Sequence, residues 1–187
     1  MTKKVLFLIT ITDQLTLQCH IINKNKTEIK INENQPITIS FNMNEIIICK
    51  ETENQINFIN EWINQPEIFK EYTITFQEKE YNVIAEVLFS LIIYQFKQII
   101  EKQFIISERR IKLPQSSQHL FINRLKVALD AVGLKGHEFD IPDFDYEKQG
   151  EIFDEILMKY KEFNKYKILF NKRNISHLID NTKPFKE

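Results

Sequence analysis

Residues 105–134, IISERRIKLPQSSQHLFINRLKVALDAVGL, contain the signals that decide the fold. The β-branched residues at its start predict a strand, and Pro114 predicts a turn with a fixed φ angle. After the turn, apolar residues recur at helical spacing on one face: Phe121, Leu125, Ala128 and Val132. Ser116 or Ser117 is a suitable N-cap for this helix, and Gly133 supplies a left-handed C-terminal stop. The stretch therefore predicts a strand, a proline turn and a helix.

The N-terminal half contains short β-rich runs separated by polar turns. These runs occupy residues 5–11, 15–22, 27–31 and 37–41. Short runs joined by polar turns predict an antiparallel meander. Further along we expect an apolar run at 45–49, a short helix within 54–62, and a hairpin from 72–76 and 79–81.

The second half is mostly helical by pattern. Asn82 is a plausible N-cap for a buried helix that reaches about Gln103. A later helix is expected at Glu147–Phe163, with acidic residues early and lysines late, followed by a last strand at Tyr166–Phe170. Strands followed by alternating strands and helices predict an α/β fold with a mixed sheet.

Composition limits the classes of function. The chain has 187 residues and 43% hydrophobic content, which suits one domain with a sizeable core or two small ones. Its net charge of −1 argues against a nucleic-acid partner and against an anionic membrane surface. Cys19 and Cys49 form no C-x-x-C pair, so neither a disulfide framework nor a zinc site is indicated, and we expect a cytoplasmic protein.

Two apolar segments resemble targeting or membrane sequences without meeting their requirements. The run Val5–Ile9 follows lysines but is short and β-branched, which favours a core strand over a signal peptide. The run Ala85–Phe96 contains Glu86 and falls short of the roughly 18 apolar residues of a membrane span. We therefore predict a buried strand and a buried helix, and no membrane partner.

Residues 105–134 resemble the segment of the seventy-kilodalton heat-shock chaperones that runs V-x-x-V-P-A-Y-F into a helix ending A-G-L. Without a gap, the coincident positions are Pro114, Lys126, Ala128, Gly133 and Leu134. Residues 34–55 are similar to the family's T-P-S-Y-V-A-F-x-x-x-E followed by K-N-Q, with matches at Pro36, Phe41, Glu45, Asn54 and Gln55. These matches follow the family's order along most of residues 4–136.

The resemblance implies a particular α/β architecture. It is a mixed sheet with an antiparallel N-terminal meander and flanking helices, like one lobe of the actin-like (ribonuclease-H-like) ATPase domain of these chaperones. Residues 1–140 would form a chaperone-ATPase-like first lobe. Residues 141–187 would form a divergent helix–strand extension packed on the same domain. The second lobe and the peptide-binding domain are expected to be missing.

The family's nucleotide site is largely degraded in this sequence. Its first phosphate loop, D-L-G-T-T, aligns with residues 9–14, which contain no glycine; the whole chain has only three. The resemblance leaves Thr12, Asp13 and Asn171 as candidate contacts for ATP or ADP with magnesium. For Thr12 and Asp13 the alternative is an ordinary polar β-turn. No cofactor is required by these patterns.

The family's catalytic residues also fail to carry over. Alignment of the family's V-F-D-A-K-R on Phe58 places Glu61 where the catalytic lysine would stand. In the family's N-E-P-T turn the proline corresponds to Pro142, but Ile141 replaces the glutamate. Since phosphoryl transfer depends on such groups, we expect no catalytic residues and no useful ATP hydrolysis. Pro114 occupies the family's switch-like proline position, although a simple strand-to-helix turn explains it as well.

Two other groups of side chains suggest functional sites, but each also has an ordinary structural explanation. His137, Glu138, Asp140 and Asp143 are grouped, but an acidic solvated loop explains them better than a metal site, so we predict no metal ligands. Trp62 and Phe69 flank Pro66. They form either an exposed aromatic edge for a partner or one closed end of the core.

Three hypotheses follow from these patterns. The first is a chaperone-like, non-hydrolysing interaction or regulatory module that binds a chaperone, a co-chaperone or a second copy of itself. The second is a residual ATP-binding member of the chaperone family. The third is an unrelated α/β structural protein whose resemblance is accidental.

Overall fold

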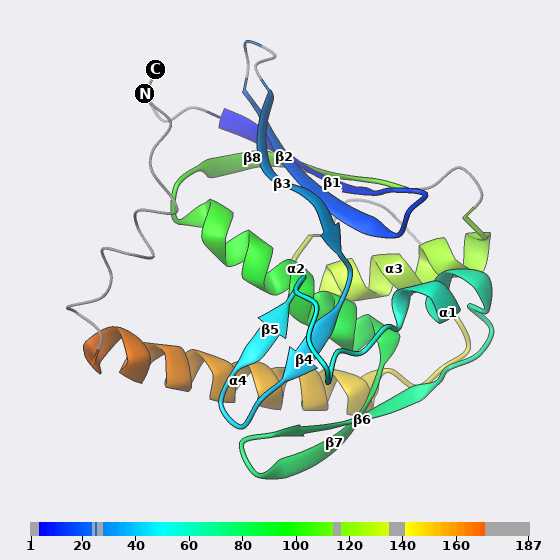
Figure 1. Cartoon of the computed structure of the whole chain (residues 1–187). Helices are drawn as coiled ribbons and strands as arrows, with labels where there is room; N and C mark the ends of the chain where they lie inside the picture. The colour runs from blue at the N-terminus through cyan, green and yellow to red at the C-terminus, as the bar shows by residue number, and fades with distance from the viewer. Residues whose placement is uncertain (1–3, 24, 26–27, 114–116, 135–140, 171–187) are drawn as a thin grey trace.

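The computed structural model describes residues 4–23, 25, 28–113, 117–134 and 141–170 (Figure 1). Its elements, in chain order, are β1 (Lys4–Ile11), β2 (Thr16–Asn23), β3 (Glu28–Pro36), β4 (Ile39–Phe41), β5 (Ile46–Ile48), α1 (Ile59–Asn64), β6 (Glu71–Phe76), β7 (Lys79–Ile84), α2 (Ala85–Glu101), β8 (Ile105–Lys112), α3 (His119–Ala131) and α4 (Glu147–Phe170).

The main sheet has four strands in the order β3-β2-β1-β8. β1 pairs antiparallel with β2, β2 pairs antiparallel with β3, and β8 returns parallel to β1. Alternate residues of β1 and β2 point into the core: Phe7, Ile9, Ile11, Leu17, Cys19 and Ile21. The predicted α/β fold with a mixed sheet is therefore confirmed, and the first three predicted runs form the antiparallel meander β1-β2-β3. The fourth run, 37–41, does not join it, because β4 pairs with β5 in a separate hairpin.

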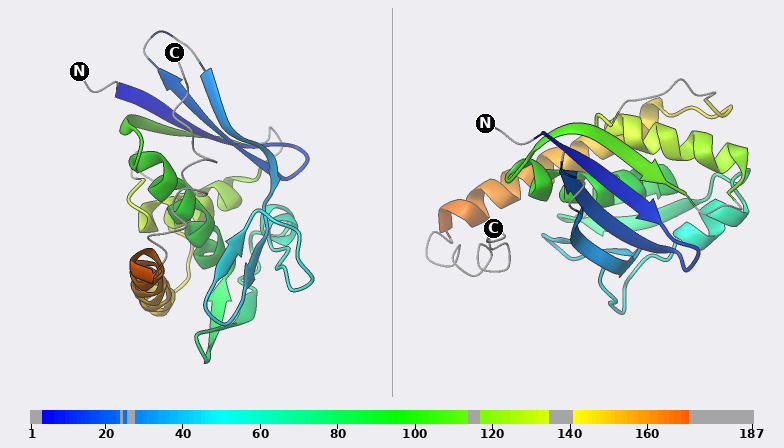
Figure 2. Two further views of the ribbon diagram at one scale, coloured as in Figure 1. Left: turned by 60° about the vertical axis from the view of Figure 1, so that its left-hand side comes forward. Right: turned by 90° about the horizontal axis from the view of Figure 1, so that it is seen from above.

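Helices cover the inner face of this sheet and build a second layer beneath it. α2 and α3 lie directly under the sheet, and α4 lies on the opposite side of α2 with the β6–β7 hairpin beside it (Figures 1 and 2). Because α2 is packed from both directions, it is apolar almost all round and its residues 85–93 are buried. α2 is thus the central element of the hydrophobic core.

Two small hairpins complete the fold. β4 pairs with β5, and β6 pairs with β7 as predicted. Gln77 and Glu78 form the tight turn between β6 and β7 with positive φ angles of 48° and 63°, which is the two-residue geometry that suits the twist of a hairpin. The Gln77 amide donates to the carbonyl of Met43, so the two hairpins are joined.

The start of α2 differs from the prediction. Asn82 lies inside β7, where its side chain accepts a hydrogen bond from the Thr73 hydroxyl, and α2 begins at Ala85. The strand continues because Tyr81 and Val83 are buried on alternate positions, so hairpin packing overrides the capping preference of asparagine. The expected N-cap at Asn82 is therefore wrong.

The face predicted for α3 is confirmed, but its cap is not. Phe121, Leu125, Ala128 and Val132 are all buried. Gly133 ends the helix with φ of +73°, a conformation that glycine adopts without a steric penalty. The N-cap is Gln118 with no side-chain cap bond, and the Ser117 hydroxyl has no partner within the part that the structure describes. Ser116 lies outside the described residues.

The predicted strand at Tyr166–Phe170 is also wrong. α4 runs without interruption from Glu147 to Phe170. After Gly150 this segment contains neither glycine nor proline, and elongation of a helix adds one backbone hydrogen bond for each residue that joins it. Gln149, Phe153 and Ile156 are the buried residues that anchor α4 on α2 and β7.

Candidate functional site

The β1–β2 turn holds the residues that the resemblance assigned to nucleotide binding. The Thr12 hydroxyl lies 2.7 Å from the Thr16 hydroxyl and accepts a hydrogen bond from the Thr16 amide. The Thr12 and Leu15 amides donate to the carbonyls of Thr16 and Thr12. Leu15 adopts a positive φ of 56°. Asp13 is exposed in the same turn. Thr12 and Asp13 are therefore neighbours in a turn that is closed by its own hydrogen bonds.

The remaining predicted residues are not brought to this turn by the described structure. Asn171 and Pro114 lie outside the described residues. Glu61, which aligns with the family's lysine, is in α1 and accepts hydrogen bonds from Lys70 and Tyr72 at 2.8–3.0 Å. The bonds from Lys70 and then Tyr72 lower the pKa of Glu61. This position therefore carries a negative charge near pH 7.

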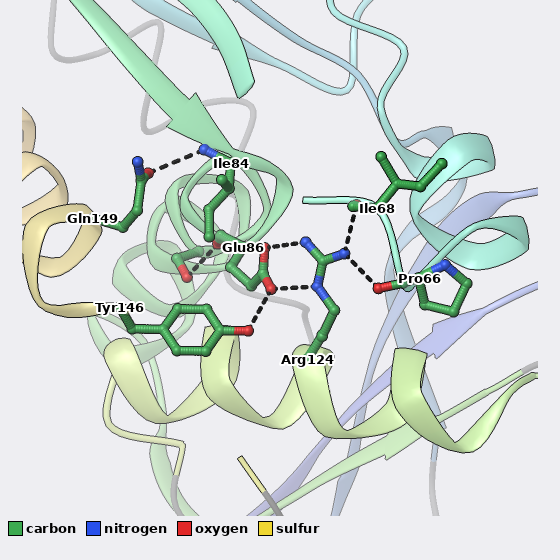
Figure 3. Close-up of polar contacts among 8 residues, drawn as sticks. Pro66, Ile68, Ile84, Glu86, Arg124, Tyr146 and Gln149 are labelled. Carbon is green, nitrogen blue, oxygen red and sulfur yellow. Dashed lines mark hydrogen bonds and ion pairs between the residues drawn. The ribbon is translucent and has the colours of Figure 1, made fainter. Parts of the chain in front are cut away.

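The most elaborate polar site lies elsewhere, between α2 and α3 (Figure 3). Arg124 Nε donates to Glu86 Oε1 at 2.5 Å, and Arg124 Nη2 donates to Glu86 Oε2 at 2.7 Å. Arg124 Nη1 donates to the backbone carbonyls of Pro66 and Ile68 at 2.9 and 3.0 Å. The Tyr146 hydroxyl donates to Glu86 Oε1 at 2.9 Å. We call this group the Arg124 clamp.

The two charged side chains of the Arg124 clamp are buried, so each depends on the other and on the surrounding hydrogen bonds. The Arg124 and Glu86 side chains are only 1% and 4% exposed. A charge removed from water is tolerated only when its partner and its hydrogen bonds are all present. Four donor bonds from Arg124 and three acceptor bonds at Glu86 meet that requirement.

Aromatic rings pack around the guanidinium of the clamp. The Phe69 ring centroid is 4.1 Å from Arg124 Cζ, a cation–π contact. Phe69 stacks on Phe144 with centroids 4.3 Å apart, and Phe144 meets Tyr146 at 4.9 Å. Burial, and then the charge of Glu86, raise the pKa of Tyr146, so its hydroxyl remains a donor.

Gln149 provides a second link from α4 to the start of α2. Its side-chain oxygen accepts from the Ile84 amide at 3.0 Å, and its side-chain nitrogen donates to the Asn82 carbonyl at 3.1 Å. Gln149 is 4% exposed. Gln149, from α4, therefore satisfies a backbone amide at the start of α2, where the sequence predicted Asn82 as the cap.

The clamp joins segments that are far apart in the sequence. α2, α3, residues 66–68 and the residues before α4 all converge on the Arg124–Glu86 pair (Figure 3). Both charged side chains are buried and hydrogen-bonded within the protein. The role of the clamp is therefore to hold parts of the chain in position. It fixes the backbone of the loop before β6 and the ring of Tyr146.

Sequence reasoning missed the clamp. In the sequence, Glu86 is a single charge within an apolar run, and Arg124 is one polar residue among several on α3. One weak signal for a buried Arg124 was present in the sequence. Arg124 directly precedes Leu125 and follows Phe121 by three positions, which places it beside the apolar face of the helix. Trp62 and Phe69, the two aromatic residues that flank Pro66, differ in burial. Trp62 is buried in the core, and Phe69 is partly exposed.

The described residues provide no metal site and no reactive thiol. In the residues that the structure describes, no group of three or more His, Cys, Asp or Glu side chains is placed to hold a metal ion. Burial raises the pKa of Cys49 to about 12 and raises that of Cys19 further, so both remain thiols. Among these same residues, no helix has the length and apolar character needed to span a bilayer.

Comparisons with known proteins find no matching family model, no matching curated protein and no matching solved structure.

Proposed function

We propose that this chain is a non-hydrolysing protein-interaction module related to the first lobe of the seventy-kilodalton heat-shock chaperone ATPase. It would act by binding a full-length chaperone, a co-chaperone or a second copy of itself. The competing function is residual ATP binding at the β1–β2 turn.

The arrangement of the main sheet supports the relationship. An antiparallel meander, a strand that returns parallel to β1, and a helix that follows this strand are the parts expected of such a lobe. Lys126 and Ala128, two of the positions that carry the resemblance, lie in α3, and β8 and α3 together contain most of residues 105–134. Fold resemblance alone does not specify activity.

The hydrogen bonds of the β1–β2 turn are the observation that supports loss of hydrolysis. A phosphate loop binds its ligand through backbone amides that point outward and have no other partner. In this turn the amides of Thr12, Leu15 and Thr16 all donate within the turn itself. These three amides are therefore already engaged and are not available to a phosphate while the turn keeps its hydrogen bonds.

The proposal includes a reducing, cytoplasmic setting. Cys19 and Cys49 are free thiols in the structure, and burial raises the pKa of each above its ordinary value. Thiols of this kind persist where glutathione and thioredoxin keep cysteines reduced.

A calorimetric titration with ATP and ADP in the presence of magnesium separates the two functions. We expect no saturable heat at millimolar nucleotide and no phosphate release, while a full-length chaperone in the same buffer shows both. Saturable binding that also raises the melting temperature, and that is lost in Thr12→Val, would instead establish the residual nucleotide site.

A second measurement tests the interaction itself. Immobilised protein should bind a purified full-length chaperone or co-chaperone, or the chain should dimerise in sedimentation equilibrium. Absence of all three associations would overturn the proposed function, whatever the nucleotide titration shows.

A further inference from the structure

The surface beside the Arg124 clamp combines apolar residues from two separate segments. Phe69 comes from the loop before β6, and Phe144 and Tyr146 come from the segment before α4; their rings contact one another. Ile68 and Ile141 flank these rings in the chain and are 52% and 66% exposed. We call Ile68, Phe69, Ile141, Phe144 and Tyr146 the aromatic patch. The three rings are partly exposed, and the two exposed isoleucines are at most three positions from a ring in the chain. A continuous apolar surface of this kind marks an interaction site.

The clamp holds the patch in a fixed arrangement. Arg124 binds the carbonyls on either side of Glu67, and Glu86 binds the Tyr146 hydroxyl. These bonds fix the loop through its backbone, so the Ile68 side chain is available while its carbonyl is bound. A surface that is ordered before binding loses less conformational entropy when a partner arrives.

Acidic residues alternate with the apolar residues of the patch. Glu67 precedes Ile68, and residues 141–147 read I-P-D-F-D-Y-E, with Asp143 and Asp145 on either side of Phe144. Glu67, Asp143 and Asp145 are exposed. The nearest lysine in the loop, Lys70, forms an ion pair with Glu61 at 2.8 Å. Lys148, which follows Glu147, is exposed too, but the exposed acidic residues outnumber it. The patch therefore presents apolar rings within a rim that is mostly negative.

We propose that the aromatic patch binds a basic, amphipathic segment of a partner protein. This inference rests on the proposed interaction function and names the surface and the partner chemistry. Apolar side chains of the partner would cover Ile141 and the rings, and its lysines or arginines would pair with Glu67 and Asp143. Arginine stacks well on aromatic rings, as Arg124 already does on the inner side of Phe69. The same negative rim repels anionic lipid and nucleic acid.

The test uses labelled synthetic peptides and fluorescence anisotropy. The probe is an amphipathic helix with leucine on one face and lysine and arginine on the other. One control peptide keeps the leucines and replaces the bases with glutamate, and another keeps the bases and replaces the leucines with serine. We expect saturable binding of the first peptide only, weakened by added salt.

Matched variants locate the binding. Ile141→Ser and Ile68→Ser remove exposed side chains and should each weaken binding by at least about fivefold, whereas Met158→Ser, a residue 63% exposed on α4, should leave it unchanged. The double variant Glu67→Lys/Asp143→Lys should weaken binding further and reduce its dependence on salt. Glu80→Lys on β7 is the control for charge alone.

Three results would overturn the proposal. Equal binding of the glutamate peptide would exclude charge recognition. Insensitivity to all the patch variants would place the peptide on another surface. Dimerisation of the chain that is abolished by Ile141→Ser, with no peptide binding, would identify a second copy as the occupant. If the protein binds a chaperone but not the basic peptide, only this inference is overturned. If it shows no association of any kind, the proposed function is overturned as well.

Discussion

Arg124 and Glu86 form a bidentate ion pair between α3 and α2, with N–O distances of 2.5 and 2.7 Å. Both side chains are almost fully buried, so most of the Coulomb attraction between them offsets the cost of their desolvation. The pair therefore adds little net stability by itself. It determines instead where the loop before β6 and the segment before α4 must lie.

Removal of one partner of this pair should be strongly destabilising. Arg124→Met leaves Glu86 buried without its counter-charge, and we expect the free energy of unfolding in urea to fall by about 3–5 kcal/mol. The double variant Glu86→Leu/Arg124→Met removes both charges and should be less destabilised than the sum of the two single variants. The exposed pair Lys70–Glu61 is the control, since Lys70→Ala should cost less than about 1 kcal/mol. A similarly small effect for Arg124→Met would show that the buried charge finds another partner or water.

Gln149 should be needed for the junction of β7 and α2. Gln149→Ala leaves the Ile84 amide and the Asn82 carbonyl without their partner, and we expect a loss of about 1–3 kcal/mol. Hydrogen exchange at the Ile84 amide should accelerate in this variant. Glu151→Ala, an exposed change on the same helix, should alter neither quantity. Unchanged protection of Ile84 would mean that another group caps α2.

The two described glycines should respond to alanine with opposite signs. Gly133 has φ of +73°, so Gly133→Ala should destabilise by about 1 kcal/mol, although its new methyl would meet only Lys97 Nζ at an ordinary 3.5 Å. Gly150 lies within α4, where an added methyl group would meet no atom of the described chain within 4 Å, so Gly150→Ala should stabilise by about 0.5–1 kcal/mol. Thermal unfolding of the two variants measures both effects. Stabilisation by Gly133→Ala would contradict the left-handed end of α3, and destabilisation by Gly150→Ala would contradict its place within α4.

The contact between the β6–β7 hairpin and α4 should weaken at acid pH because of Glu155. The hydrogen bond from Lys79, followed by that from Tyr81, lowers the pKa of Glu155 from an ordinary 4.5 to about 2. A carboxyl group with a lowered folded-state pKa stabilises the fold above its unfolded pKa, and this contribution disappears as pH falls from about 4.5 through about 2. A carboxyl NMR titration should detect the low pKa, and Lys79→Met should move it back toward 4.5. A pKa that does not respond to this change would show that Lys79 is not the main cause.

Elements whose signals are local could be predicted from the sequence. The buried face of α3, its stop at Gly133, the β6–β7 hairpin and the N-terminal meander all follow from periodicity and turn chemistry within a few residues. The predicted strand at Tyr166–Phe170 failed because its short apolar run fits either a strand or a continuing helix. The cap at Asn82 failed because the packing of Tyr81 and Val83 continues β7 through Asn82, and α2 begins only at Ala85.

What the sequence by itself determined is the class of fold, the order of most elements, and the absence of glycine from the first turn. Only the tertiary structure decided that Glu86 and Arg124 meet, and that Phe69 stacks on Phe144. Glu86 and Arg124 are 38 positions apart, and Phe69 and Phe144 belong to different loops. No periodicity links such residues, because their contact depends on how α2, α3 and α4 pack around one core and not on the local conformation of the chain.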